Sequence, residues 1–149
     1  MSTLERVATP LLFAEQLRTV RGKTRLQKLV CLLDVRWTKE GKRLGYRFQF
    51  YHHGPFSFDL MNAVEDLVDE GLMLERPRSL PNGYVEYSYT LSPSGRKLIH
   101  RLLSSDRHLK ELRADIAELS KSHGMLPLKD LVEEAYAARS ELGESPVSE

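Results

Sequence analysis

The segment from Lys23 to Trp37 constrains the fold more than any other part of the chain. Five apolar residues repeat there in steps of three and four, which is the spacing of one helical face: Leu26, Leu29, Val30, Leu33 and Trp37. Further apolar residues lie outside that face, so the predicted helix is apolar over more than half of its circumference. Such a helix has to be covered from several sides, and we expect it at the centre of the core. Thr24, followed three residues later by Gln27, predicts a capping box at its start.

The overall composition is that of an ordinary globular domain. The 149 residues are 41% hydrophobic and 29% charged, which suits one domain with a core of useful size. No apolar run is long enough to span a bilayer, and the first residues lack the apolar region of a signal peptide. The single cysteine excludes an internal disulfide. We therefore expect a cytoplasmic protein.

Patterns on both sides of the central helix predict further elements in the first half of the chain. Thr9 and Pro10 are residue types of an N-cap and of a first helical position, so a first helix is expected to begin there. Aromatic and polar residues alternate over 46–51, as in a half-buried strand. Ser57 then predicts the N-cap of a helix over 57–70.

The second half of the chain contains a hairpin pattern followed by helical ones. Over 72–91, two strand-like stretches flank the turn dipeptide Asn82-Gly83, which predicts a β-hairpin. Ser92 and Pro93 begin a further predicted helix, and the serines and aspartate at 104–106 predict a break before the next one. A last helix is expected over about 128–138. The apolar stripe along 98–119 is a candidate seam for a homodimer.

These elements predict an α+β fold that is mostly α, with a winged helix-turn-helix core, a small antiparallel sheet and C-terminal helices. The helix at 57–70 has the position of a recognition helix, and the hairpin that of the wing. The strand at 46–51 departs from a tight helix-turn-helix and could pair with the wing. We expect a winged-helix domain over 1–103, a helical extension over 104–139 and a disordered tail over 140–149.

Several of these segments together resemble a known group of proteins. They are Arg25 to Val30, the aromatic strand at 48–51, the turn from His53 to Ser57 and the hairpin end Tyr89-Thr90-Leu91. They are similar to the bacterial and archaeal YwgA-like proteins and, more distantly, to the SocA-type antitoxin domain called Panacea. The similarity covers about residues 20 to 100. It implies a winged-helix fold without catalysis and, in the antitoxin relatives, a protein that restrains or delivers a partner protein.

The charges are unevenly distributed although the net charge is only +1. Residues 1–56 hold eleven Lys and Arg against four Asp and Glu, whereas residues 57–91 hold two against seven. The predicted recognition helix therefore has an acidic face, which we expect to bind a partner: Asp59, Asn62, Glu65, Asp66 and Asp69. A basic face is expected to bind nucleic acid or protein: Arg18, Arg21, Lys23, Arg25, Lys28, Lys42, Arg43, Arg76 and Arg78.

The sequence offers little that indicates catalysis or a bound metal. His52 and His53 are adjacent at a strand end and point to opposite sides, which does not suit two ligands of one metal. Cys31 lies among leucines in the central helix, as a small buried side chain does. No glycine-rich phosphate loop or hydrolase motif is present. We expect no enzyme, no cofactor and no metal site.

The acidic helix decides between two functions expected for such a fold. DNA affinity comes largely from neutralising phosphates, which a helix with five carboxylates and no cation does not do. The leading hypothesis is therefore a non-catalytic regulatory module, antitoxin- or adapter-like, that binds a partner macromolecule, with a protein favoured as that partner. The alternative is a DNA- or RNA-binding transcriptional regulator that uses the basic face and the wing.

Overall fold

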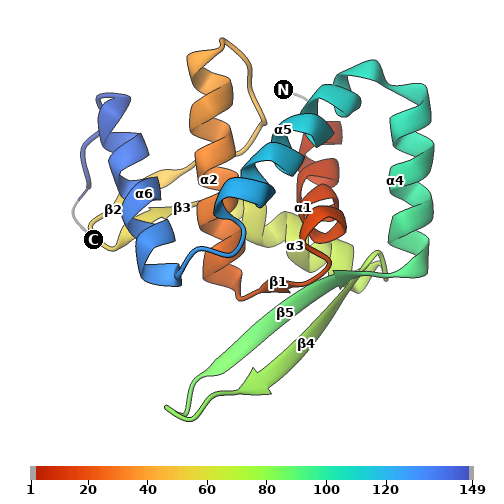
Figure 1. Ribbon diagram of the computed structural model, residues 1–149, viewed down its shortest axis with the longest axis horizontal. Helices are drawn as coiled ribbons and strands as arrows, with labels where there is room; N and C mark the ends of the chain where they lie inside the picture. The colour runs from red at the N-terminus through yellow and green to blue at the C-terminus, as the bar shows by residue number, and fades with distance from the viewer. Residues whose placement is uncertain (1–2, 148–149) are drawn as a thin grey trace.

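The computed structural model describes residues 3–147, which form an α+β fold that is mostly helical (Figure 1). The elements in chain order are α1 (Thr3–Leu17), β1 (Val20–Arg21), α2 (Lys23–Lys39), β2 (Gln49–Tyr51), β3 (Gly54–Phe56), α3 (Phe58–Asp69), β4 (Met73–Ser79), β5 (Val85–Leu91), α4 (Pro93–Ser105), α5 (Arg107–His123) and α6 (Leu128–Glu141). The helices pack together, and the β4–β5 hairpin projects from them. No helix within residues 3–147 is long and apolar enough to cross a membrane.

Helix α2 is at the centre of the core, as the sequence predicts. Ten of its seventeen residues are buried, and the helix contacts α1, α5, α6 and β3. Trp37 is fully buried near its end, and its indole N–H donates to Asp115 of α5 at 2.8 Å. Three of the buried residues are polar, namely Gln27, Lys28 and Asp34. Buried polar groups need partners, and those partners organise the rest of the fold.

The predicted capping box of α2 is wrong. The N-cap is Gly22, and no side chain caps the helix there. The reason is that the chain enters α2 directly from a strand: the Gly22 N–H donates to the Tyr87 carbonyl of β5 at 2.9 Å. Gly22 has φ +98°, a conformation that glycine adopts readily. Thr24 is exposed, and Gln27 is directed to another element.

The predicted start of the first helix is also wrong. Helix α1 begins at Thr3, so Pro10 lies inside it and Thr9 is not its N-cap. A proline inside a helix leaves the carbonyl four residues earlier without its usual donor. Here that carbonyl belongs to Arg6, and the hydroxyl of Tyr46 donates to it at 2.5 Å. Tertiary structure thus supplies the hydrogen bond that Pro10 removes.

The strand that pairs with the β4–β5 hairpin is not the predicted one. The larger sheet has the order β1-β5-β4, all antiparallel, so the β4–β5 hairpin pairs with β1, a strand that we did not predict. The strand predicted over 46–51 shortens to β2, which does not join this hairpin. It pairs instead with β3, Tyr51 lying opposite Gly54 across a two-residue turn. The reason is that β3 is held against α2, where the Lys28 ammonium donates to the Pro55 carbonyl.

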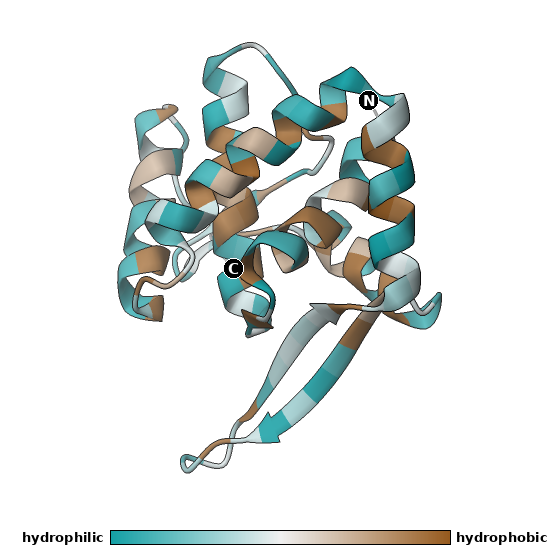
Figure 2. Cartoon of the chain, turned by 45° about the vertical axis from the view of Figure 1, so that its right-hand side comes forward, coloured by the Kyte–Doolittle hydropathy of each residue, from teal (hydrophilic) through white to brown (hydrophobic). Residues whose placement is uncertain are grey.

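The hairpin predicted over 72–91 is confirmed as β4 and β5. Beyond Met73, every residue of β4 is exposed, and Figure 2 shows its outer part as mainly hydrophilic. Pro77 lies within β4, where its missing N–H is tolerated because β4 is the edge strand of the sheet. The hairpin therefore offers most of its surface to solvent or to a partner.

The C-terminal helices break where the sequence predicts. The Asp106 carboxylate caps α5 by accepting from the N–H groups of His108 at 2.8 Å and Leu109 at 3.3 Å. Part of the apolar stripe over 98–119 packs against the protein's own core. Four of its residues are buried there: Leu109, Leu112, Ile116 and Leu119. Those four are covered without a second copy, and a homodimer stays a prediction.

Residues after Ala138 make contacts that the sequence did not indicate. Helix α6 runs on to Glu141, and the predicted tail is described as far as Val147, whose N–H donates to the Phe50 carbonyl at 2.7 Å. Ser148 and Glu149 lie outside the described residues. Helix α5 packs on α1 and α6 packs on α2. The boundary expected at residue 103 stays a prediction.

The packing of α4 against the start of the hairpin yields a stability prediction. A Cβ added at Gly95 would lie 2.0 Å from the Leu72 carbonyl oxygen, so backbone would have to move. We expect Gly95→Ala to lower the free energy of unfolding by about 3 kcal/mol, near the upper end of overpacking effects. The measurement is urea denaturation followed by circular dichroism. The control is Ser94→Ala, an exposed neighbour in the same helix, for which a comparable loss would contradict this account.

Candidate functional site

Two segments that carry the sequence resemblance, Arg25 to Val30 and His53 to Ser57, are in contact in the structure. The side-chain amide of Gln27 donates to the Ser57 carbonyl and accepts from the Ser57 N–H, each at 2.9 Å. The neighbouring Lys28 ammonium donates to the Pro55 carbonyl at 2.5 Å. All these groups are buried. The turn before α3 is therefore attached to α2 by three hydrogen bonds from adjacent side chains.

Gly54 is required at this attachment for two reasons. Its φ is +122°, and an added Cβ would lie 3.3 Å from the Lys28 Nζ. Burial lowers the pKa of Lys28, because desolvation disfavours the ammonium. Lys28 is thus a structural donor and not a member of an exposed basic face.

Helix α3 carries the predicted acidic face, and most of that face is free. Ser57 caps the helix as predicted, its Oγ accepting from the Leu60 N–H at 3.2 Å. Because Leu60, Val64 and Leu67 are buried, the polar side of the helix is turned outward. Exposed polar residues that make no ion pair within the described part of the chain are Asn62, Glu65, Asp66, Asp69 and Glu70.

Asp59 is the exception among the predicted acidic residues. Its carboxylate accepts from the Arg47 backbone N–H at 2.9 Å and lies 3.5 Å from the guanidinium groups of Arg6 and Arg47. Only 18% of its side chain is exposed. Asp59 therefore joins the start of α3 to α1 and to the segment before β2, and its charge is already matched.

A small apolar notch lies next to the acidic face, between α2, α3 and β5. It has a volume of about 50 Å³. Its lining is mainly apolar, with a lysine and a glutamate among the lining residues: Lys23, Leu26, Gln27, Phe56, Leu60, Met61, Val64, Glu65 and Tyr89. This volume corresponds to about four water-sized spheres, enough for the end of one apolar side chain. No pattern in the sequence indicated the notch, because its lining comes from four separate elements.

The nine residues predicted as one basic face do not form one surface. Arg25 donates to the carbonyls of Gly124 at 3.1 Å and Leu126 at 2.7 Å, beyond the end of α5. Lys42 pairs with Glu40 at 3.1 Å, and both it and Arg43 follow the far end of α2. Together with buried Lys28, these residues are separate from the cations near the sheet.

The remaining predicted cations are divided between the two faces of the larger sheet. Arg21 of β1 and Arg76 of β4 both lie opposite Ser88 of β5, so they are on the same face. Arg78, two residues beyond Arg76, shares that face and pairs with Glu86 at 3.1 Å. Lys23 is on the other side, 4.5 Å above the ring of Tyr87. We call the face with Arg21, Arg76 and Arg78 the outer face, because the opposite one packs on the core through Val20 and Tyr89.

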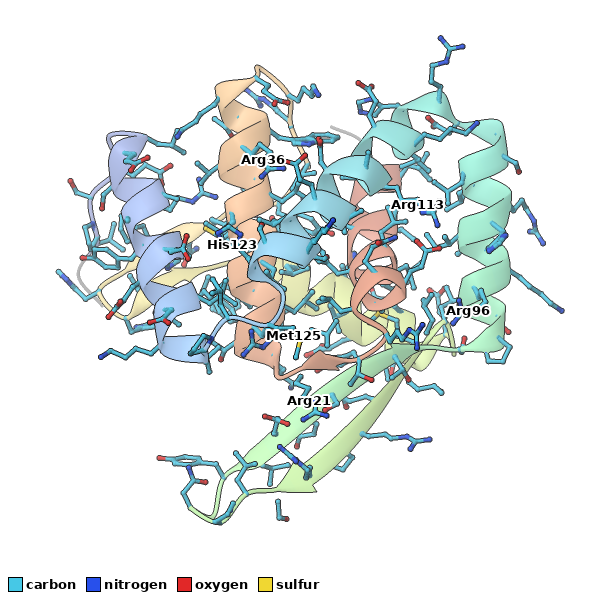
Figure 3. The ribbon with its side chains drawn as sticks, viewed as in Figure 1. Arg21, Arg36, Arg96, Arg113, His123 and Met125 are labelled. Atoms are coloured by element: carbon cyan, nitrogen blue, oxygen red, sulfur yellow. The ribbon has the colours of Figure 1, made fainter. Side chains whose placement is uncertain are left out.

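Helix α4 adds cations that the sequence reasoning missed. Arg18 and Arg96 line one hollow beside Thr90, at the end of the outer face. Figure 3 shows Arg21 over β5 and Arg96 where β5 meets α4. Lys97 and Arg101 are exposed further along α4. The four-residue spacing of Lys97 and Arg101 was visible in the sequence, but the proximity of Arg96 to Thr90 of β5 depends on the fold.

The remaining candidates for chemistry are structural or isolated. Cys31 is fully buried, and burial raises the pKa of its thiol to about 11. Beside it, Arg139 of α6 pairs with Asp34 of α2 at 2.5 Å. His52 and His53 are exposed, and the His53 ring stacks on Tyr51. Within residues 3–147, no three His, Cys, Asp or Glu side chains form a group that could hold a metal ion.

Comparisons with known proteins add no family to this description. No family model matches the chain, and no curated protein matches it. What the protein does is therefore inferred from its surfaces, together with the sequence resemblance described above.

The attachment of α3 to α2 yields a second stability prediction. Gln27→Ala leaves the buried Ser57 N–H without a partner, whereas the Ser57 C=O still accepts from the Met61 N–H at 3.2 Å. One unpaired buried group costs about 1–3 kcal/mol, so we expect a loss of about 2 kcal/mol in the free energy of unfolding, measured by urea denaturation. Thr24→Ala, one turn earlier and without a side-chain cap contact, is expected to cost less than about 0.5 kcal/mol. Equal losses for the two variants would contradict the assignment.

The buried cysteine yields a prediction about reactivity. With a pKa of about 11, about one Cys31 thiol in a thousand is ionised at pH 8, and the residue is fully buried. We expect iodoacetamide to leave the folded protein unmodified over an hour at pH 8, as measured by intact mass. In 8 M urea the same reagent should modify the single thiol completely. Rapid modification of the folded protein would show that Cys31 is accessible.

Proposed function

We propose that this protein is a non-catalytic winged-helix module that binds a partner protein through α3 and the adjacent notch. The succession α1, β1, α2, α3, β4, β5 with the sheet order β1-β5-β4 supports the winged-helix part of the proposal. In it, α3 takes the position of the recognition helix and β4–β5 that of the wing. The β2–β3 hairpin is inserted where a tight turn is usual.

The observation that carries the proposal is the unpaired acidic side of α3. Glu65, Asp66 and Asp69 are exposed and make no ion pair within residues 3–147. Near phosphates these charges would be repelled, since nucleic-acid binding depends on neutralising phosphates and releasing counterions. Against a basic protein surface the same charges favour association and orient the partner. Electrostatics therefore favours a protein over a DNA groove at this helix.

The notch specifies the partner further. Energetically important contacts in protein interfaces are commonly side chains that fill a desolvated pocket surrounded by polar residues. Here the pocket is lined by apolar side chains such as Leu60 and Val64, and Glu65 lies at its edge. The partner segment that fits this geometry has one apolar side chain for the notch and Lys or Arg residues beside it for the carboxylates.

The sequence resemblance supports a regulatory role of this kind. The segments shared with YwgA-like proteins and the SocA-type domain include Gln27, Lys28 and the turn from His53 to Ser57. In this structure, those residues attach α3 to α2. They would thus preserve the orientation of a helix that presents a binding surface. An antitoxin- or adapter-like protein needs that property and needs no catalytic group.

A charge-reversal experiment tests the proposal. Proteins retained from native lysate by the tagged chain are identified by mass spectrometry, and a stoichiometric partner is purified and titrated by calorimetry. Asp66→Lys with Asp69→Lys is expected to raise the dissociation constant by at least about tenfold, because both charges lie in the proposed interface.

The matched control is Asp130→Lys with Glu133→Lys, which changes the net charge equally on exposed positions of α6. We expect the control to bind within about twofold of the unmodified protein. Recovery of no stoichiometric protein partner would overturn the proposal. So would a partner that loses as much affinity with the control pair as with the α3 pair.

A further inference from the structure

The outer face of the larger sheet carries arginines whose charges are not matched within the described structure. Arg21, Arg76 and, at the end of the face, Arg18 and Arg96 are exposed and make no ion pair among residues 3–147. This surface differs from the basic face predicted from sequence, since it excludes Arg25, Lys28, Lys42 and Arg43.

The acidic residues near these arginines are already engaged elsewhere. Glu86 on the outer face pairs with Arg78 at 3.1 Å. Glu15, in the hollow with Arg18 and Arg96, accepts from the guanidinium of Arg113 at 2.9 and 3.2 Å. The local acids therefore do not neutralise the exposed arginines, and the surface has an excess of positive charge.

Helix α4 extends this surface beyond the sheet. Arg96, Lys97 and Arg101 are exposed on α4, and Arg96 borders both the hollow at Thr90 and the neighbouring surface of α4. The part of this surface that lies on the sheet is about 23 Å long, since β5 has seven residues at 3.3 Å per residue. Six exposed cations without an ion pair among residues 3–147 therefore lie along the outer face and α4, with Arg96 bordering both hollows between them: Arg18, Arg21, Arg76, Arg96, Lys97 and Arg101.

The side chains between these cations favour a duplex over a single strand. Single-strand binding surfaces stack successive bases on aromatic rings. Residues alternate in direction along β5, so Ser88 and Thr90 are on the outer face while Tyr87 and Tyr89 are on the other. Of the aromatic residues in the hairpin, only Tyr84 at the tip is not on the core-facing side, and it is 72% exposed. Such a surface can contact the backbone of a duplex, but it has no row of rings for stacking.

The sheet also separates this surface from the acidic helix. Tyr89, which belongs to the core-facing side, lines the notch together with Glu65 of α3. Glu65 therefore lies on the side of the sheet opposite to Arg21 and Arg76. We propose that the outer face of the sheet, continued by α4, binds the phosphate backbone of duplex nucleic acid, independently of the protein-binding surface at α3. The module would then connect a partner protein to a duplex.

Fluorescence anisotropy with labelled 24-base-pair duplexes of random sequence tests this inference. DNA and RNA duplexes and single-stranded DNA are titrated with the full chain between 50 and 200 mM salt. Binding of either duplex supports the proposal, and the tighter one identifies the source of the phosphates. Arg21→Ala with Arg76→Ala and Arg96→Ala is expected to weaken duplex binding at least tenfold. It should also reduce the slope of log K against log salt by about 2.7.

The matched control removes three exposed cations from other surfaces: Arg43→Ala, Lys121→Ala and Lys129→Ala. It changes the net charge equally and is expected to keep duplex affinity within twofold. Circular dichroism establishes that both triple variants are folded. Equal losses in the two variants, absence of salt-dependent duplex binding, or tighter binding of the single strand would each overturn the inference.

A further variant distinguishes this inference from the proposed function. Glu65→Gln with Asp69→Asn removes carboxylates from α3, and we expect it to leave duplex affinity unchanged or slightly higher. A loss of duplex binding would place the nucleic acid at α3 and overturn the separation of the two surfaces. Conversely, the result of the Asp66→Lys with Asp69→Lys experiment on partner-protein binding does not bear on the duplex affinity, which is measured separately.

Discussion

The amide side chain of Gln27 binds the backbone of Ser57 at both its N–H and its C=O, and the position of α3 follows from this contact. A glutamine amide offers one donor side and one acceptor side, which matches the backbone C=O and N–H of Ser57; that C=O also accepts from the Met61 N–H of α3 at 3.2 Å. Lys28 adds a third bond to the Pro55 carbonyl. Because these groups are buried, losing the Gln27 acceptor leaves the Ser57 N–H without water or partner.

This contact explains why Gln27 and Lys28, two of the three buried polar residues of α2, are found among apolar side chains. The segment before α3 is short, and its backbone has to leave the β2–β3 hairpin and enter a helix at a defined angle. Once Ser57 is held, its hydroxyl is in place to cap α3 through Leu60. The direction of α3, and with it the direction of Glu65 and Asp66, is set by side chains of another helix. The surface chemistry of the protein thus depends on its core.

The larger sheet has a comparable effect on charge. It is thin, and its residues alternate between two faces, so neighbours in sequence belong to different environments. Tyr89 is buried beside the notch and the acidic helix, whereas Ser88 lies between Arg21 and Arg76. A chain with a net charge of +1 thereby presents an acidic and a basic surface at the same time. Long-range attraction to partners depends on this distribution more than on the net value.

Local signals in the sequence were sufficient for those elements whose capping and burial are local. They predicted the apolar α2, the cap at Ser57, the hairpin and the break at Asp106, because each depends on residues within one or two turns. The same signals misplaced the start of α1, where Tyr46 supplies the bond that Pro10 removes, and the cap of α2, where Gly22 continues a strand. Those outcomes depend on residues about 36 and 65 positions away.

By itself, the sequence determined that α2 is central, that α3 is acidic and that the first third of the chain is basic. Only the tertiary structure decided which of the charges are available. The side chains of Lys28 and Arg25 donate to backbone carbonyls, Asp59 pairs with Arg6, and Arg96 lies with Arg18 in one hollow. The physical reason is that burial and pairing of a charge depend on contacts between segments far apart in the chain, which no local pattern records.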